Sequence, residues 1–277
     1  MKSLATMAMA GAALAAAGAA NAAELEVRNA AVRVTVIPEA RSDIGVSIVK
    51  ANPRLHFRMM RLGDKVVIDG ELGFRGPDCT NVFGRRGVRI WGLGFIPYDD
   101  LPQIVVRTPL DTKVSAGGAV YGVIDRATSV DLSNSGCGDW SVASVAGPLT
   151  VRMAGSGDVR GGDSDSAHVR IAGSSDVFLR SVRSGLDTAS SGSGNLHAES
   201  VVGPLHVRIA GSGDVTVPTG QVTDMSVAVA GSGDIRYGGV AQNLDATIVG
   251  SGDVSVSRVT GHVSKRVAGS GSVSIGS

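Results

Sequence analysis

The stretch Gly211-Ser212-Gly213-Asp214-Val215 decides how this chain folds, because close copies of it recur through the second half of the sequence. The copies begin at Gly136, Gly155, Gly173, Gly192, Gly211, Gly231, Gly250 and Gly269, and a weaker copy begins at Gly117. Successive copies start 18 to 20 residues apart, most often 19. A period of this length indicates a solenoid, in which each repeat forms one coil of a continuous stack.

The apolar residues keep the same phase as the glycines. When the first glycine of each copy is position 1, position 5 is apolar in all eight copies: Trp140, Val159, Val177, Leu196, Val215, Ile235, Val254 and Val273. A second apolar group alternates with polar residues near the end of each period, as in Leu205-His206-Val207-Arg208-Ile209. Such alternation is typical of a strand with one buried face. Each coil is therefore predicted to contain two short strands, at positions 4–7 and 14–18.

One coil of this size cannot bury its own apolar face. Stacking coils about 4.8 Å apart lets each strand bond to its copies above and below and makes a continuous core. The sequence predicts an all-β fold, a single-stranded parallel β-helix (β-solenoid) with ~19-residue coils. A Greek-key sandwich has no reason to keep a constant period.

The chain before the repeats divides into two further parts. Residues 1–22 have the order of a secretory signal peptide, with Lys2, an apolar run from Leu4 to Ala20, and Ala20-Asn21-Ala22 at the cleavage point. Residues 23–116 are predicted to be an N-terminal β segment that begins the same sheet with irregular strands and caps the stack. Residues 117–277 are the regular solenoid. The predicted location is therefore the periplasm, the cell surface or the medium.

Composition argues against several partners. The net charge is +1, with 26 basic and 25 acidic residues well mixed, which gives no overall field of the kind that binds nucleic acid or anionic lipid. After the signal peptide, no apolar run approaches the ~18 residues that span a bilayer. We expect no nucleic-acid partner, no transmembrane segment in the mature chain and no cofactor.

Cys79 and Cys137 are the two cysteines of the chain. In an oxidising compartment they are predicted to form a disulfide, which would tie the N-terminal segment to an early coil and stabilise by about 3–4 kcal/mol in the chain-entropy picture. The alternative is two separate thiols.

The serial repeats after an exported N-terminus resemble the bacterial "putative auto-transporter adhesin, head GIN domain" family. The likeness extends from Leu25-Glu26-Val27-Arg28-Asn29 through Arg107-Thr108-Pro109-Leu110 to the last coil. The resemblance implies a right-handed β-solenoid of pectin-lyase-like appearance, without a known catalytic set and with an adhesive or surface role. That role is an analogy within the family.

The repeats also place acidic residues in a column at position 4. Its members are Asp139, Asp158, Asp176, Asn195, Asp214, Asp234 and Asp253, followed by Ser272. Clustered carboxylates could bind a hard cation such as calcium. We favour a structural role, in which each side chain accepts hydrogen bonds from backbone N–H groups of its own turn, because Asn and Ser can do the same. No metal site is therefore predicted. The glycines at positions 1 and 3 are expected to supply positive φ angles.

Two groups of residues are candidates for binding. Arg152, Arg170 and Arg208 share position 17 and could bind acidic polysaccharide, although such a stripe also serves to keep strands from aggregating. Residues 74–98 are rich in aromatic and arginine side chains, from which we select Phe83, Arg85, Arg86, Trp91, Phe95 and Tyr98. Exposed, they would bind sugar or an envelope protein. We favour burial, as a hydrophobic plug of the cap.

Catalysis has little support, because neither a Gly-x-Ser-x-Gly elbow nor a His-Glu-x-x-His motif occurs. The leading hypothesis is an exported, non-catalytic solenoid for adhesion, surface binding or envelope scaffolding. One alternative is a pectin-lyase-like, polysaccharide-active enzyme that uses Asp163 or Asp165. Another is end-to-end self-association through the last coil, Ser272-Val273-Ser274-Ile275, as a structural protein.

Overall fold

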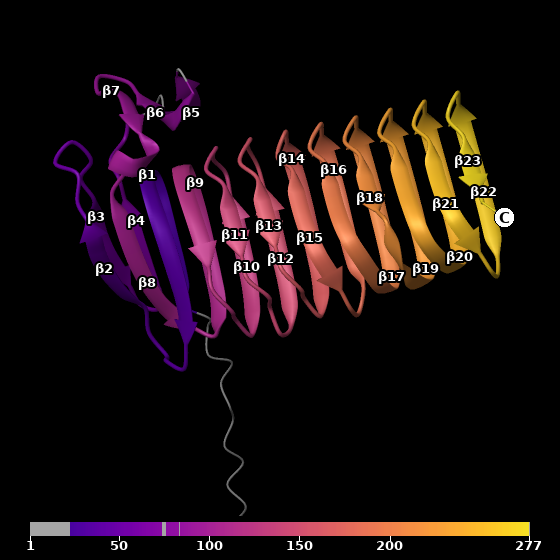
Figure 1. Cartoon of the computed structure of the whole chain (residues 1–277), viewed down its shortest axis with the longest axis horizontal. Helices are drawn as coiled ribbons and strands as arrows, with labels where there is room; N and C mark the ends of the chain where they lie inside the picture. The colour runs from indigo at the N-terminus through magenta and orange to yellow at the C-terminus, as the bar shows by residue number, and fades with distance from the viewer. Residues whose placement is uncertain (1–22, 74–75, 83, 277) are drawn as a thin grey trace, which may run out of the picture.

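The computed structural model describes residues 23–73, 76–82 and 84–276. The predicted signal peptide and Phe83 lie outside these residues. The described part consists of strands β1 to β23 and one short 3-10 helix, η1 (Tyr98–Asp100). Figure 1 shows these strands as a rod of stacked coils. The predicted parallel β-solenoid of about 19-residue coils is confirmed.

The later strand of each coil belongs to a parallel sheet that we call sheet 1. In stacking order its members are β10 (Ser129–Asn134), β12 (Pro148–Met153), β14 (Ser166–Gly173), β16 (Leu186–Gly192), the second parts of β17 (Leu196–Gly211), β19 (Thr219–Gly231) and β20 (Ile235–Gly250), and β22 (Val263–Gly269). After each of these strands a short corner turns the chain; its sequence is Gly-Ser-Gly except for Gly136-Cys137-Gly138 after β10 and Gly173-Ser174-Ser175 after β14.

The chain then enters the earlier strand of the next coil, which belongs to sheet 2. Its members are β11 (Trp140–Val142), β13 (Val159–Gly161), β15 (Val177–Val182), the first part of β17, β18 (Val215–Val217), the first part of β20, β21 (Val254–Val259) and β23 (Val273–Ile275).

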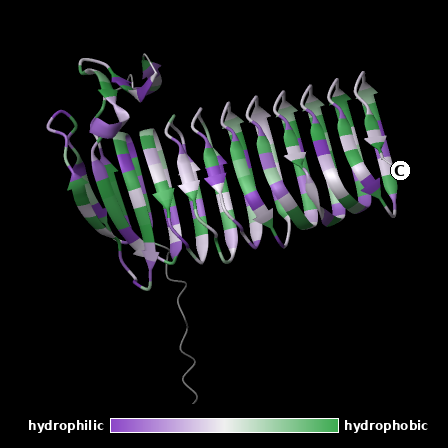
Figure 2. Ribbon diagram, viewed as in Figure 1, coloured by the Kyte–Doolittle hydropathy of each residue, from purple (hydrophilic) through white to green (hydrophobic). Residues whose placement is uncertain are grey.

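The core lies between the two sheets. The position 5 residues stack directly on one another, as Trp140 on Val159 and Val159 on Val177, and these side chains are buried. Figure 2 shows the resulting alternation of hydrophobic and hydrophilic residues along the strands. The period of the sequence therefore sets the register of the whole stack.

The N-terminal coils do not follow chain order. Strand β1 (Glu24–Glu39) runs along both sheets and pairs on one side with β9 (Asp111–Ile124). On its other side it pairs with β4 (Lys65–Asp69) and β8 (Gln103–Pro109), also in parallel. The first strand of the described chain therefore lies inside the stack and not at its end.

The end of the stack is formed by two antiparallel strands. Strand β2 (Gly45–Lys50) pairs with β8, and β3 (Arg58–Leu62) pairs with β4. The reversal of strand direction ends the parallel ladder at this point (Figure 1).

An insertion between β4 and β8 forms a separate three-stranded antiparallel sheet of β5 (Pro77–Val82), β6 (Arg85–Ile90) and β7 (Gly94–Pro97). It packs on the outside of β1 and β9 through a small second core that includes Val88, Ile90 and Ile96. The predicted disulfide between Cys79 and Cys137 is confirmed and joins β5 to the first regular corner, with a Cα–Cα distance of 5.7 Å.

The aromatic side chains of the insertion do not form the buried plug that we favoured. Trp91 is 77% exposed, and Phe95 and Tyr98 are half-buried. Aliphatic side chains form most of the second core instead, together with the buried Tyr121 of β9, and Tyr98 packs against them.

Candidate functional site

The acidic column at position 4 is a hydrogen-bond ladder that runs along the rod. The Oδ1 atom of each member accepts a bond from the backbone N–H of the equivalent residue in the next coil, at 2.8 to 3.1 Å. Asn195 bonds to Asp214 in the same way, and the ladder ends at the N–H of Ser272. We expected each of these side chains to accept a hydrogen bond, but from a backbone N–H of its own turn. The donor lies one coil away, because the corner interrupts the backbone ladder between coils there.

Glycine is favoured at positions 1 and 3 of the corner for two different reasons. At position 1, Gly211 has a φ of 148°, and a Cβ there would lie 2.3 Å from the Gly192 carbonyl oxygen. At position 3, Gly213 does not have the positive φ angle that we expected. A Cβ added to Gly213 would, however, lie 2.2 Å from the Gly194 carbonyl oxygen. Close approach of stacked backbones therefore explains position 3.

The arginines of sheet 1 are neutralised by carboxylates from neighbouring coils. Arg152 forms an ion pair with Asp131, and Arg170 and Arg208 both pair with Asp187, at 3.0 and 3.4 Å. Burial opposes ionisation of Asp187, yet the hydrogen bond from Arg170 and the charges of Arg170, His168 and Arg208 hold its pKa below the ordinary value. This face offers few unpaired positive charges to an anion.

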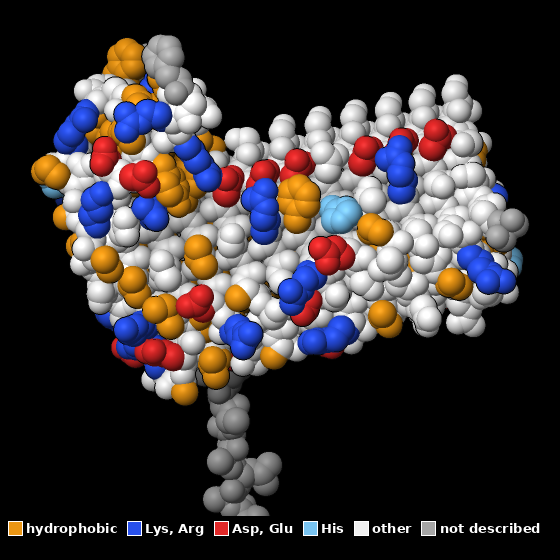
Figure 3. All heavy atoms as spheres, in the orientation of Figure 1, with side chains coloured by type: hydrophobic (Ala, Val, Ile, Leu, Met, Phe, Trp, Pro, Cys, Tyr) orange, Lys and Arg blue, Asp and Glu red, His pale blue; other side chains and the backbone are white. Residues whose placement is uncertain are grey.

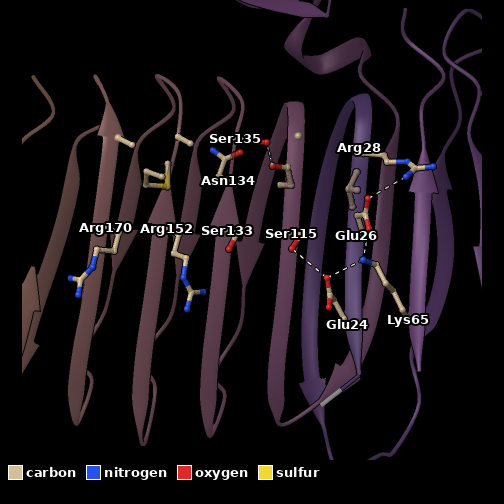
Figure 4. Close-up of a pocket in the computed structure, with 16 residues that line it drawn as sticks. Glu24, Glu26, Arg28, Lys65, Ser115, Ser133, Asn134, Ser135, Arg152 and Arg170 are labelled. Atoms are coloured by element: carbon tan, nitrogen blue, oxygen red, sulfur yellow. Dashed lines mark hydrogen bonds and ion pairs between the residues drawn. The ribbon is translucent and has the colours of Figure 1, made fainter. Parts of the chain in front are cut away.

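A groove of about 550 Å³ crosses sheet 1 between the N-terminal coils and β14. Figure 4 shows Glu24, Glu26 and Lys65 on one side and Arg152 and Arg170 on the other, with small serine side chains between them. Lys65 contacts Glu26 at 2.5 Å and Glu24 at 3.2 Å. The hydrogen bond from Lys113 is the largest cause of the lowered pKa of Glu24. The groove therefore combines small apolar side chains with paired charges and has no aromatic side chain among its lining residues.

Aromatic and arginine side chains meet where the insertion touches sheet 2. The rings of Tyr98 and Tyr121 pack edge to face, with centroids 5.1 Å apart. The Arg33 guanidinium lies 4.4 Å from the Tyr98 ring, and Arg86 lies over both rings and pairs with Asp139. A pocket of about 190 Å³ is open beside them.

The lining of this pocket continues along sheet 2 to Arg160, which lies 5.4 Å from the ring of Phe178 in the next coil. Phe178 is 39% exposed and contacts His197, in the coil after it, with ring centroids 6.4 Å apart. Figure 3 shows basic, hydrophobic and histidine side chains in sequence along this face. The following residues form what we call the aromatic–arginine row: Arg33, Arg86, Tyr98, Tyr121, Arg160, Phe178 and His197.

The structure brings together only some of the predicted binding residues. Arg86 and Tyr98 belong to the row, whereas Arg85 is exposed at the start of β6 and Trp91 lies in the turn between β6 and β7. Phe95 packs beside Gly87 within the insertion. The other members of the row were missed, although Arg160, Phe178 and His197 share position 6 of the repeat and an alignment of the coils on that position contains the signal.

The two carboxylates of the enzymatic alternative are bound in structural contacts. Arg180 donates two hydrogen bonds to Asp163, at 2.6 and 2.7 Å, and these bonds lower the pKa of Asp163. Asp165 accepts a bond from the Ser184 hydroxyl at 2.8 Å. In the described ranges, no group of three or more His, Cys, Asp and Glu side chains is arranged to hold a metal ion.

Comparisons with known proteins show a family similarity for part of the repeats. No curated protein matches the chain. A solved structure, titled as a putative lipid binding protein from Parabacteroides distasonis ATCC 8503, covers 92% of each chain with 18% sequence identity and a TM-score of 0.42. Over the described residues, no helix is long and apolar enough to cross a membrane. Residues 168–277 match the model of the family described as "Putative auto-transporter adhesin, head GIN domain", which confirms the family resemblance for this part of the chain.

Proposed function

We propose that this protein is an exported, non-catalytic binding protein that holds an acidic polysaccharide along the aromatic–arginine row. The observation that supports this proposal is the run of Arg160, Phe178 and His197 over three successive coils, continuous with the pocket beside Tyr98. An exposed ring such as that of Phe178 gives a flat apolar surface on which a sugar ring stacks, and guanidinium groups pair with carboxylates. The adhesin description of the matching family agrees with a binding role.

The row suits a linear polymer better than a small ligand. Its members come from different coils, so contacts repeat along the rod at the spacing of the stacked strands, about 4.8 Å. Arg160 lies over the Phe178 ring and forms no ion pair with a carboxylate of the described residues, which leaves its charge for a ligand. Arg152, Arg170 and Arg208, in contrast, each form an ion pair with a carboxylate.

The enzymatic alternative has less support. Hydrolysis of a glycosidic bond by a pair of carboxyl groups needs one that stays protonated near neutral pH, and Arg180 shifts the pKa of Asp163 in the opposite direction. A non-catalytic role is therefore the better proposal for this surface.

Binding of acidic polysaccharides to the purified protein, first on a glycan array and then by calorimetry, tests the proposal. We expect Phe178→Ala and Arg160→Gln each to weaken binding about tenfold, because an exposed anchor contributes on the order of 1–2 kcal/mol. Thr216→Ala, in the same column two coils from Phe178, and Arg266→Gln, on sheet 1, are matched controls that should bind normally. Equal losses in the variants and the controls, or no binding of any acidic glycan, would refute the proposal.

A further inference from the structure

Both ends of the rod expose strand edges. Among the described residues, β22 and β23 each pair with one strand only, and β2 and β3 do so at the other end (Figure 1). Unpaired backbone N–H and C=O groups on such edges are a template for the addition of another chain. Apolar side chains are open there too, since Val267 is 44% exposed and Met59 is 50% exposed. The other side chains of these four strands therefore decide whether copies of the rod stack end to end.

One core column of sheet 1 begins and ends with a cation. In register from one end of the rod to the other, its members are Arg61, Val66, Leu25, Val114, Leu132, Val151, Val169, Thr188, Val207, Val227, Ala246 and Lys265. All members between the two cations are uncharged and buried. Register partners point to the same face of a sheet, so Arg61 and Lys265 start toward the core and not toward solvent.

At the β22–β23 end, the lysine side chain reaches across the core to sheet 2. Lys265 Nζ donates a hydrogen bond of 3.1 Å to the Val273 carbonyl oxygen. One coil earlier, the Val254 N–H donates to the Ser272 carbonyl of the next coil, and Val254 is in register with Val273. Because the N–H and C=O of one strand residue point to the same side, the Val273 carbonyl points toward the free end. Lys265 therefore bonds to an acceptor that a further coil would use.

At the other end, Arg61 makes an equivalent contact. Its Nη2 atom donates a hydrogen bond of 2.7 Å to the carbonyl oxygen of Ile44, which directly precedes β2. Strand β2 continues sheet 2 through its pairing with β8. The exposed Asp43 carboxylate next to Ile44 is paired with Arg41 at 2.9 Å. Within the described ranges, both cations thus bond to carbonyl groups from the opposite side of the core, and neither forms an ion pair.

The position 4 ladder also stops at the β22–β23 end. Ser272 N–H bonds to Asp253 Oδ1, as in the earlier coils, but the Ser272 hydroxyl donates to the same oxygen, at 2.8 Å. Asp253 and the members before it place an Oδ1 atom where the next coil's N–H bonds to it. The single side-chain oxygen of Ser272 lies against Asp253 instead. This coil therefore lacks the side-chain acceptor that holds one corner to the next.

We propose that Arg61 and Lys265 close the two ends of the solenoid against a second copy of the chain. In a head-to-tail stack that continued the core, Arg61 of one copy would lie over Lys265 of the other. A two-fold pairing of like ends would bury two arginines or two lysines. Each arrangement places like charges in the apolar core, where an unpaired charge is costly. The rod therefore stays one copy long, which goes beyond polysaccharide binding and does not depend on it.

Sedimentation velocity over a wide range of protein concentration tests this proposal. We expect self-association through the last coil to become at least about a hundredfold stronger in Lys265→Val, because valine is the commonest member of the column and removes the buried charge. Arg61→Val should expose the other end in the same way. The double variant should form linear assemblies of many copies, because both of its ends are open. Hydrogen exchange locates the contact, since the amides of β22 and β23 should become protected as Lys265→Val associates.

Two matched controls lose the same charge and gain the same side chain on the opposite face of the same strands. Arg266→Val is in register with Thr247 on β22, and Arg58→Val is in register with Asp69 on β3. Both should associate as little as the unchanged protein, as should Lys265→Arg, and circular dichroism should show that every variant is folded. Three results would overturn the proposal: association of the unchanged protein through β22 and β23, a folded Lys265→Val that associates no more than Arg266→Val, or equal association of Lys265→Arg and Lys265→Val.

Discussion

At the scale of single residues, the position 4 side chain supplies a hydrogen bond that the backbone cannot make. The carbonyl of each of these residues accepts a hydrogen bond from the preceding coil, as the Asp158 carbonyl does from the Trp140 N–H. The N–H has no such partner and bonds to the side chain of the preceding coil instead. One small acceptor per coil therefore keeps the corners in register.

Replacement of Asp214 tests this role. In Asp214→Ala, the N–H of Asp234 loses its acceptor, and we expect the free energy of unfolding to fall by about 1–2 kcal/mol. Asp214→Asn keeps an Oδ1 acceptor, as Asn195 does naturally, so it should cost less than about 0.5 kcal/mol. Urea titration followed by circular dichroism measures both. If the two variants were equally destabilised, the charge and not the hydrogen bond would be the stabilising feature.

The residue scale also shows how far the sequence could reach. The columns at position 5 and position 4 were predictable, because each depends on contacts between residues about 19 apart. The donor to each Asp side chain was not predictable. The sequence repeat is the same whether the hydrogen bond forms within one coil or between two coils. Arg86 and Tyr98 were selected because residues 74–98 are rich in aromatic and arginine side chains. Their partners Arg33 and Tyr121 contact them only because the insertion packs against the solenoid.

At the scale of elements, sheet 1 holds a charged cluster in which Asp187 of β16 joins Arg170 of β14 and Arg208 of β17. His168 Nδ1 lies 3.3 Å from the same carboxylate. The cluster links three neighbouring strands on their solvent face. Its contribution to stability depends on the ionisation of one carboxyl group.

The pH dependence of stability tests this cluster. The pKa of Asp187 is lower in the folded protein than in the unfolded chain, so its contribution is complete above the unfolded pKa of about 4 and is lost as the pH falls through the folded pKa. Asp187→Asn should lower the free energy of unfolding by about 1 kcal/mol at neutral pH and by progressively less in acid. Urea titrations at several pH values measure the difference, with Asp125→Asn as an exposed control. A deficit that stayed constant down to about pH 2 would contradict the assignment.

The arrangement of the N-terminal strands was the least predictable feature at this scale. Strands β1, β4 and β8 have the alternating apolar pattern of any half-buried strand, and that pattern does not specify the neighbour. Leu25 pairs with Val66 on one side and with Val114 on the other, far beyond the 19-residue period. No repeat in the sequence spans those distances, so only the folded structure places β1 inside the stack.

At the scale of the whole molecule, the disulfide fastens the insertion to the solenoid. The bridge closes a loop of 57 residues between Cys79 and Cys137, and the insertion otherwise packs through a small core. Cys79→Ser with Cys137→Ser should lower the free energy of unfolding by about 3–4 kcal/mol. We also expect proteases to cleave the insertion first in this variant, while the coils from β12 onward remain intact. Mass spectrometry of the fragments checks the order, and equal resistance of the insertion in the two proteins would show that the bridge is dispensable for its docking.

The enclosed position of β1 sets the order in which the polypeptide is able to assemble. Each coil after β9 finds a finished template about 19 residues behind it, whereas β1 pairs with β4 and β8 on one edge and must wait for Val114 and the rest of β9 to cover the other. The strands from β1 to β9 are therefore expected to form first, through costly long-range closures, and the remaining coils then add to them one at a time. A chain that emerges N-terminus first suits such growth, because its slow step is over before most of the rod exists.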